Sequence, residues 1–189
     1  SSSAGDVGFA WGKTKGIADD SIAIDLQYRV WNVTTLTASA SINLTITTGS
    51  ISWVEMWSHP ASGSNQSDIT LCYGTGRRTG STQGPQIGCL VWDGASNTWG
   101  NQKRLNQDAE EDTIIGDTKS FSGFYEQGSG DFIGISSTEG STNSSFITFT
   151  TSWAAASTSF GFGDNGMIIN CSPMPYISGV TNNQAVCGN

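Results

Sequence analysis

Hydrophobic and polar residues alternate along much of this chain. Between residues 21 and 30 every second position is apolar, occupied by Ile22, Ile24, Leu26, Tyr28 and Val30. An alternation of period two is typical of a strand with one packed face and one face in water. The run from Leu36 to Ile46 keeps the alternation and is long for one strand, so we expect a bend or bulge near residues 38–40.

Shorter strand-like segments follow as far as the C-terminal region, and clusters of glycine and serine separate them. They cover residues 51–57, 68–73, 86–92, 119–125, 131–136, 145–153, 158–162, 167–171 and 176–180. Many short strands with regular turn signals are typical of an antiparallel sandwich or barrel. We therefore predict an all-β fold, an antiparallel, jelly-roll-like β-sandwich of roughly ten to twelve strands.

Only residues 101–112 have any helical character, with Leu105 and Ala109 as their apolar residues. At most one short surface helix is expected there. No linker-like segment and no repeat divides the chain, which predicts a single domain over residues 1–189. Residues 1–18 are a looser N-terminal segment, in which Phe9 and Trp11 would anchor a short strand. If that segment does not pack on its own domain, it could add to the sheet edge of a neighbouring molecule.

Composition supports the all-β prediction and excludes several partners. Ser, Thr, Gly and Asn make up 84 of the 189 residues, and their low helix propensity disfavours long helices. Aromatic residues make up 10% of the chain, which argues against disorder. The net charge is −8 and the pI is about 4.3, without a basic stripe for phosphates, so we expect no nucleic-acid partner. No run reaches the roughly 18 apolar residues of a membrane span, so we expect no membrane insertion.

Glycosylation sequons and cysteines predict a secreted, extracellular glycoprotein. The five sequon asparagines are Asn32, Asn43, Asn65, Asn143 and Asn170. Asn43 lies on the polar side of an alternating run, where a glycan could project. Four cysteines allow three pairings, and closure of local loops favours Cys72–Cys89 and Cys171–Cys187, each worth roughly 3 kcal/mol.

Trp53, Glu55 and Trp57 recur at every second position and would share one face of a strand. A carboxyl group between two indoles suits a sugar cleft, because the rings stack on pyranoses and partial desolvation favours proton transfer. Glycoside hydrolysis requires a second carboxyl group within about 5 to 9.5 Å. The candidates are Asp93, Glu126 and Asp131, and we take Glu126 as the partner of Glu55 in this hypothesis.

The segment Val91–Gly100 has a second pattern, in which an Asp-Gly turn would display Asp93, Asn97 and Trp99 near one loop tip. A carboxylate and an amide can bond adjacent hydroxyls while an indole covers the C–H side of a sugar. Trp53, Trp57, Asp93, Asn97 and Trp99 are therefore the candidate ligand-binding residues. The loop Gly161–Gly166, with Asp164 and Asn165, is a weaker candidate of the same kind.

The remaining polar clusters are interpreted as surface features. Arg77 and Arg78 could clamp a carboxylate or sulfate, but a solvated loop is the simpler interpretation. Calcium could bind the acidic run that holds Asp108, Glu110, Glu111 and Asp112, but the loop lacks the usual ligand alternation. With His59 as the one histidine, we expect no metal and no cofactor, and no nucleophile motif supports a catalytic triad.

Three functions remain open at this point. The first is carbohydrate binding of a lectin-like kind, which depends on the tryptophans and the Asp/Asn loops. A self-assembling extracellular surface protein that adds strands between its copies is an alternative, because few lysines blunt the sheet edges. The other alternative is a secreted acid glycoside hydrolase with a cleft centred on Glu55.

Overall fold

The computed structural model describes about half of the chain. The described residues are 7–13, 25–31, 40–42, 51–59, 68–75, 87–94, 96, 98–106, 121–126, 129–137, 143–154, 157–161, 170–173 and 185–188. They contain thirteen strands and no helix: β1 (Val7–Lys13), β2 (Asp25–Trp31), β3 (Ala40–Ile42), β4 (Ile51–Ser58), β5 (Ile69–Thr75), β6 (Ile87–Asp93), β7 (Thr98–Asn106), β8 (Phe121–Tyr125), β9 (Phe132–Ser137), β10 (Asn143–Phe149), β11 (Ser157–Gly161), β12 (Asn170–Pro173) and β13 (Ala185–Gly188). The all-β prediction is confirmed, and no helix among the described residues could cross a membrane.

All described pairings are antiparallel, and the strands form four sheets in chain order: β1-β2-β3, β4-β5-β6-β7, β8-β9-β10-β11 and β12-β13. Consecutive neighbours make each sheet an up-and-down meander. The Greek-key connections of a jelly roll are not among the described pairings. The sandwich is thus built from sequential hairpins.

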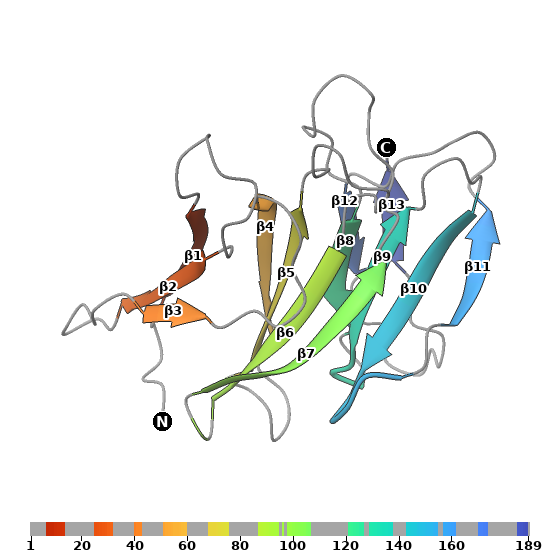
Figure 1. Cartoon of the computed structure of the whole chain (residues 1–189). Coiled ribbons are helices and arrows are strands. Elements are labelled where there is room, and N and C mark those ends of the chain that lie inside the picture. Colours follow the sequence, from red (N-terminus) through yellow and green to blue (C-terminus); the bar gives the residue numbers. More distant parts are fainter. Residues whose placement is uncertain are drawn as a thin grey trace.

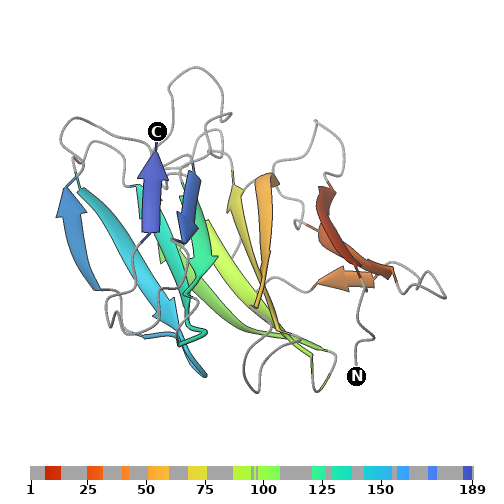
Figure 2. The same cartoon turned by 180° about the vertical axis from the view of Figure 1, so that it is seen from behind.

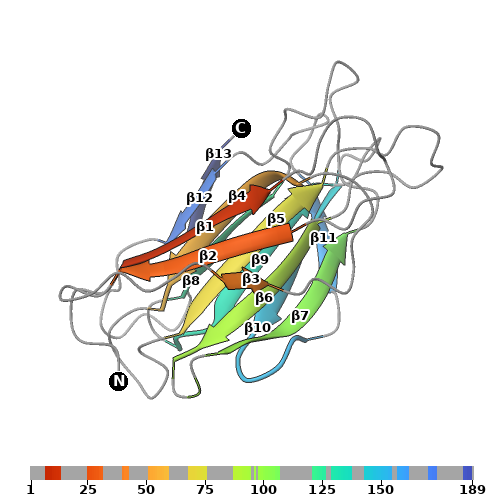
Figure 3. The same ribbon diagram turned by 60° about the vertical axis from the view of Figure 1, so that its left-hand side comes forward.

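The sheet β4–β7 lies in the middle of the molecule (Figure 1). One of its faces packs against β1–β3, which cross in front of it in Figure 3, and the other packs against β8–β11. The pair β12–β13 lies beside β8 (Figure 2), where the Cys171 N–H donates to Ser122 Oγ at 2.9 Å. The three larger sheets thus form three layers with β4–β7 in the middle, and β12–β13 covers part of the outer face of β8–β9, where Phe124, Ile135 and Cys171 form a third buried cluster.

Strand β5, in the middle of the central sheet, is buried on both faces. Every residue of β5 after Ile69 is buried. Leu71 and Tyr73 pack in the cluster shared with β2 and β3, while Cys72 packs in the cluster shared with β8, β9 and β10. Because both faces are covered, side chains on both sides of this strand are buried, including the polar Thr70 and Thr75.

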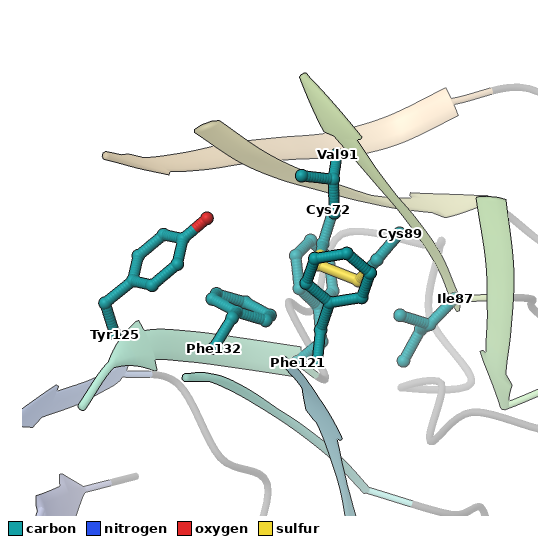
Figure 4. Packing of buried hydrophobic residues seen from close by; sticks show 8 residues of the cluster. Cys72, Ile87, Cys89, Val91, Phe121, Tyr125 and Phe132 are labelled. Atoms are coloured by element: carbon teal, nitrogen blue, oxygen red, sulfur yellow. A yellow bond between two sulfur atoms is a disulfide. The ribbon is translucent and has the colours of Figure 1, made fainter. Parts of the chain in front are cut away.

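The Cys72–Cys89 disulfide lies at the centre of the core between the two larger sheets (Figure 4). Both cysteines are fully buried and stand directly opposite each other in the β5–β6 pairing. Aromatic and aliphatic residues from both sheets surround them, namely Ile87, Val91, Phe121, Tyr125, Phe132 and Phe149. The local pairing predicted for these two cysteines is confirmed.

Cys171 is also disulfide-bonded, and its cross-strand neighbour in the β12–β13 register is Cys187. This register is consistent with the second predicted pairing. The part of the chain that the structure describes contains no free cysteine.

Residues 101–106 belong to strand β7, so the helix expected from residue 101 onward is wrong for this part of the segment. Asn101, at φ 49°, forms a bulge in the β6–β7 pairing. The bulge lets Trp99 and Gln102 pack on the same side of the sheet although they are three residues apart. Backbone pairing with β6 and packing of Leu105 on the core outweigh the weak helical pattern. Residues 107–112 lie outside the described part.

The N-terminal strand is packed on its own domain. Strand β1 pairs with β2 over its whole length, from Val7–Trp31 to Lys13–Asp25. Ala10 faces the core, whereas Phe9 is 50% exposed, so the expectation that Phe9 anchors this strand is wrong. The predicted bend near residues 38–40 lies almost wholly outside the described residues, which resume at Ala40.

Burial of the Cys72–Cys89 disulfide leads to the first prediction. Because no thiol reagent can reach sulfur atoms inside a closed core, this bond should resist reductant in the folded protein and react only after unfolding. Replacing both cysteines by alanine should lower the free energy of unfolding by about 3 kcal/mol. Denaturant titration and thiol counting on the native protein measure the two effects. Rapid reduction of this bond without loss of tertiary structure would contradict the burial.

Two glycines give a matched pair for testing the packing. A Cβ on Gly123 would lie 2.3 Å from Phe132 Cζ and 3.1 Å from the Ile133 carbonyl oxygen, whereas a Cβ on Gly100 would meet nothing within 4 Å. We expect Gly123→Ala to destabilise the protein by about 1–3 kcal/mol and Gly100→Ala to be neutral or stabilising by up to about 1 kcal/mol. Thermal unfolding of both variants tests this, and equal effects would show that Phe132 does not cover Gly123.

Candidate functional site

Trp53, Glu55 and Trp57 do share one face of β4, as their spacing predicts, but that face is turned toward the second sheet. Glu55 stands opposite the buried Cys72 in the β4–β5 register, and directly opposite residues share a face. Trp57 packs on the core, with its ring centroid 5.3 Å from that of Phe132. Trp53 is 39% exposed, and Glu55 Oε2 is shielded from solvent.

Glu126 occupies the turn between β8 and β9 and is 4% exposed. Its N–H donates to the Asp131 carbonyl at 2.8 Å, its carbonyl accepts from the Gly130 N–H at 2.9 Å, and its Oε2 accepts from the Ser129 N–H. Gly130 has φ 78°, a backbone conformation that favours glycine. The Glu126 carboxylate therefore closes this turn.

The hairpin between β6 and β7 has an exposed polar end. Asp93 Oδ2 accepts from Ser96 Oγ at 2.8 Å, and Ser96 Oγ also lies 2.7 Å from Thr98 Oγ1. All three residues are exposed. Asp93 and Thr98 are paired across the hairpin, whereas the tryptophans next to them point to the other face of the ribbon. The sequence thus placed Asp93 and Trp99 on one hairpin correctly, but their side chains leave it on opposite faces.

Trp92 and Trp99 stand directly opposite each other in the β6–β7 register, with ring centroids 5.5 Å apart. Tyr28 of β2 completes an aromatic triad, at 5.5 Å from Trp92 and 5.7 Å from Trp99. All three side chains are partly exposed. We call Tyr28, Trp92 and Trp99 the aromatic triad.

The triad is packed too tightly to hold a ligand between its rings. The centre of a triangle with these sides is only about 3.2 Å from each centroid, less than the 3.5–4.0 Å separation of carbon atoms in contact. Interplanar angles of 58°, 76° and 64° also mean that no two rings are coplanar. A ligand could therefore stack only on the outward side of one ring.

The indole Nε1 of Trp99 is buried and makes no hydrogen bond with any described residue. An unsatisfied buried donor costs about 1–3 kcal/mol. Among the described residues, this ring is held by its cross-strand and inter-sheet aromatic contacts.

Sequence reasoning missed Tyr28 and Trp92. The signal for Trp92 was present, because Trp92 and Trp99 are equally far from the middle of the Gly94–Asn97 turn and must therefore pair across the hairpin. Tyr28 comes from another sheet, so its contact depends on how the layers pack.

A polar cluster at the same end of the molecule links the central sheet to β8. Thr70 Oγ1 lies 2.7 Å from Tyr125 OH, which projects from β8 toward the other sheet (Figure 4). The ring of His59 packs edge-on against that of Tyr125, with 4.9 Å between the ring centroids. The backbone N–H of His59 donates to the backbone carbonyl of Asp68 at 3.0 Å. Burial raises the pKa of Tyr125, the Asp68 carboxylate adds to this, and the Thr70 hydrogen bond opposes it.

Several predicted positions lie outside the described residues. They are Asn32, Asn43, Asn65, Arg77, Arg78, Asn97, Asp108, Glu110, Glu111, Asp112, Asp164 and Asn165. Asn143 and Asn170 each begin a strand, and glycosylation at any of the five asparagines stays a prediction. Within the described part, no three His, Cys, Asp or Glu side chains lie close enough together to hold a metal ion.

Comparison with known proteins gave no family model that matches the sequence, and no curated protein or solved structure that is similar to it.

Burial should make Tyr73 and Tyr125 titrate at a higher pH than a tyrosine in water. Burial raises the pKa of Tyr73 to about 12, against the opposing effects of the Gln102 hydrogen bond and the Arg104 charge. Since the pKa of a tyrosine in the unfolded chain is 10.0, the contribution of Tyr73 to stability is complete below pH 10 and is lost as the pH rises to about 12.

The absorbance of the phenolate measures this titration. In the Tyr73→Phe variant, one group fewer should titrate late, and the melting temperature should fall less above pH 10 than in the parent protein. If every tyrosine of the folded protein ionised together near pH 10, the burial of Tyr73 and Tyr125 would be wrong.

Proposed function

We propose that this protein is a secreted carbohydrate-binding protein whose site lies at the β6–β7 hairpin. The observation that carries the proposal is the partly exposed aromatic triad beside the polar hairpin end. Indole and phenol rings stack on the C–H face of a sugar, and carboxylate and hydroxyl groups bond its hydroxyls. This combination matches the two kinds of surface that a sugar presents.

Asp93 is suited to the polar part of such a site. Its carboxylate accepts from the Ser96 N–H at 3.4 Å and from Ser96 Oγ at 2.8 Å. The Asp93 side chain is exposed, and a carboxylate is a strong acceptor for the hydroxyls of a sugar. Because Asp93 and the tryptophans leave the hairpin on opposite faces, a ligand that contacts both must extend over the hairpin end.

The tilt of the triad rings limits the form of the ligand. A flat polysaccharide surface requires several coplanar aromatic rings, and these rings are tilted by 58–76°. The site therefore suits one sugar ring on one aromatic face, at the end or in a branch of a soluble glycan.

Secretion is part of the proposal. A buried disulfide is expected in an oxidising compartment and is rare in the cytosol. Together with the five sequons, it supports an extracellular location.

The two alternatives have less support. For the hydrolase, Glu55 faces the inter-sheet core and Glu126 closes a turn, so neither carboxylate is placed at a described opening. For assembly by strand addition, β1 is already paired with β2 of its own chain, and the edge strand β7 carries Lys103 and Arg104, which discourage edge pairing.

Tryptophan fluorescence titration with soluble plant, fungal and animal oligosaccharides tests the proposal. Trp92→Ala should weaken binding at least tenfold, because the stacking surface is lost, and Asp93→Ala should weaken it severalfold. Trp53→Ala, which removes an exposed indole on another strand, is the matched control and should bind like the parent.

Melting temperatures of the three variants separate lost binding from lost folding. The proposal fails if no glycan changes the fluorescence of the parent protein, or if Trp92→Ala and Trp53→Ala have the same affinity.

A further inference from the structure

The hairpin that carries the Trp92–Trp99 pair is tied to the neighbouring strand by one side chain. Gly94, the first residue after β6, is buried, and its N–H donates to Asp68 Oδ1 at 3.0 Å. Asp68 immediately precedes β5, so this bond continues the β5–β6 pairing one step beyond the last backbone pair, Ile69–Trp92. A side chain thus acts here where a backbone carbonyl would otherwise be needed.

A buried amide without an acceptor is unfavourable, and a carboxylate is a stronger acceptor than a neutral group. The bond from Asp68 therefore restricts the direction in which the backbone leaves β6 at Gly94. Because Trp92 lies only two residues before Gly94, the exit direction also sets how Trp92 meets Trp99.

Asp68 is itself held in place. Its carbonyl accepts from the His59 N–H at 3.0 Å, and Thr70, two residues along the same strand, is bonded to Tyr125 of the second sheet. The acceptor of the Gly94 bond is thereby tied to the end of β4 through the His59 backbone N–H, a contact that does not involve the Tyr125 hydroxyl.

We propose that Asp68 is a positioning residue for the candidate sugar site: it fixes the β6–β7 hairpin through Gly94 and so sets the geometry of Trp92 and Trp99. The effect on glycan affinity rests on the proposed function, whereas the effect on the tryptophan pair does not.

Three variants test this. Asp68→Ala removes the acceptor, and Asp68→Asn keeps an oxygen at the same position. Tyr125→Phe is the matched control, because it breaks the bond to Thr70 at the same end of the molecule but leaves the Gly94 bond intact.

The first measurement is the far-ultraviolet circular dichroism couplet of the tryptophan pair. Two indoles 5.5 Å apart and tilted by 64° couple strongly, and a Trp92→Phe variant identifies their signal by its loss. We expect Asp68→Ala to lose at least half of the couplet, Asp68→Asn to keep most of it, and Tyr125→Phe to keep it despite a lower melting temperature. An unchanged couplet in folded Asp68→Ala would overturn the proposal.

A second measurement needs no variant. Magnetic resonance of the parent protein should show a scalar coupling through the hydrogen bond between the Gly94 amide nitrogen and the Asp68 carboxyl carbon, and slow exchange of the Gly94 amide. If Asp68→Ala does not fold, this measurement on the parent protein tests the proposal in its place. A Gly94 amide that exchanges rapidly and shows no coupling to Asp68 refutes the proposal.

The third measurement is affinity. For a glycan that binds the parent, Asp68→Ala should bind roughly ten- to a hundredfold more weakly, the equivalent of one hydrogen bond to a charged group, and Asp68→Asn should recover most of this. Absence of glycan binding in the parent would count against the proposed function alone, since the couplet and the Gly94 amide still test Asp68. Loss of the couplet with unchanged affinity would refute the role of Asp68 in binding.

Discussion

The central sheet is covered on both faces, and most features of this protein depend on that constraint. Strand β5 sends Cys72 into one core and Tyr73 into the other, and both residues are fully buried. Gly74 makes the close approach of two layers possible, because a Cβ there would lie 3.1 Å from the Phe121 ring of β8. Within the central sheet, Gly88 leaves room for the side chain of its cross-strand partner Tyr73, whose OH would lie 2.5 Å from a Cβ on Gly88.

This layering decides which aromatic residues remain available for a ligand. Trp57 packs against Phe132 between the two larger sheets, whereas Trp92 and Trp99 lie where β2 meets the hairpin, on the other face of the central sheet; all three indoles are partly exposed. The aromatic triad therefore has two roles, joining two sheets and offering a stacking surface. Asp68 links these roles, because it connects the hairpin to the part of the molecule where His59, Thr70 and Tyr125 hold the large sheets together.

The candidate site shows where sequence reasoning succeeds and where it ends. The spacing of Trp53, Glu55 and Trp57 correctly gave a shared face, but it could not tell that this face would be covered by a second sheet. The helix expected from residue 101 is wrong because hairpin pairing with β6 and the packing of Leu105 on a core formed with β8, β9 and β10 outweigh the weak helical pattern. Side-chain patterns report which residues lie together on a strand and not what lies opposite them.

The sequence alone determined the all-β class, most of the strands in the middle of the chain and the preference for the Cys72–Cys89 pairing, because each depends on local terms: the two-residue period of a strand and the closure of a short loop. Tertiary structure alone decided the order of the layers, the contact of Tyr28 with the two tryptophans, and the bond from Asp68 to Gly94. These contacts join segments far apart in the chain, and their free energy comes from burying particular faces against one another. One chain pattern is compatible with several such arrangements, so only the folded structure distinguishes them.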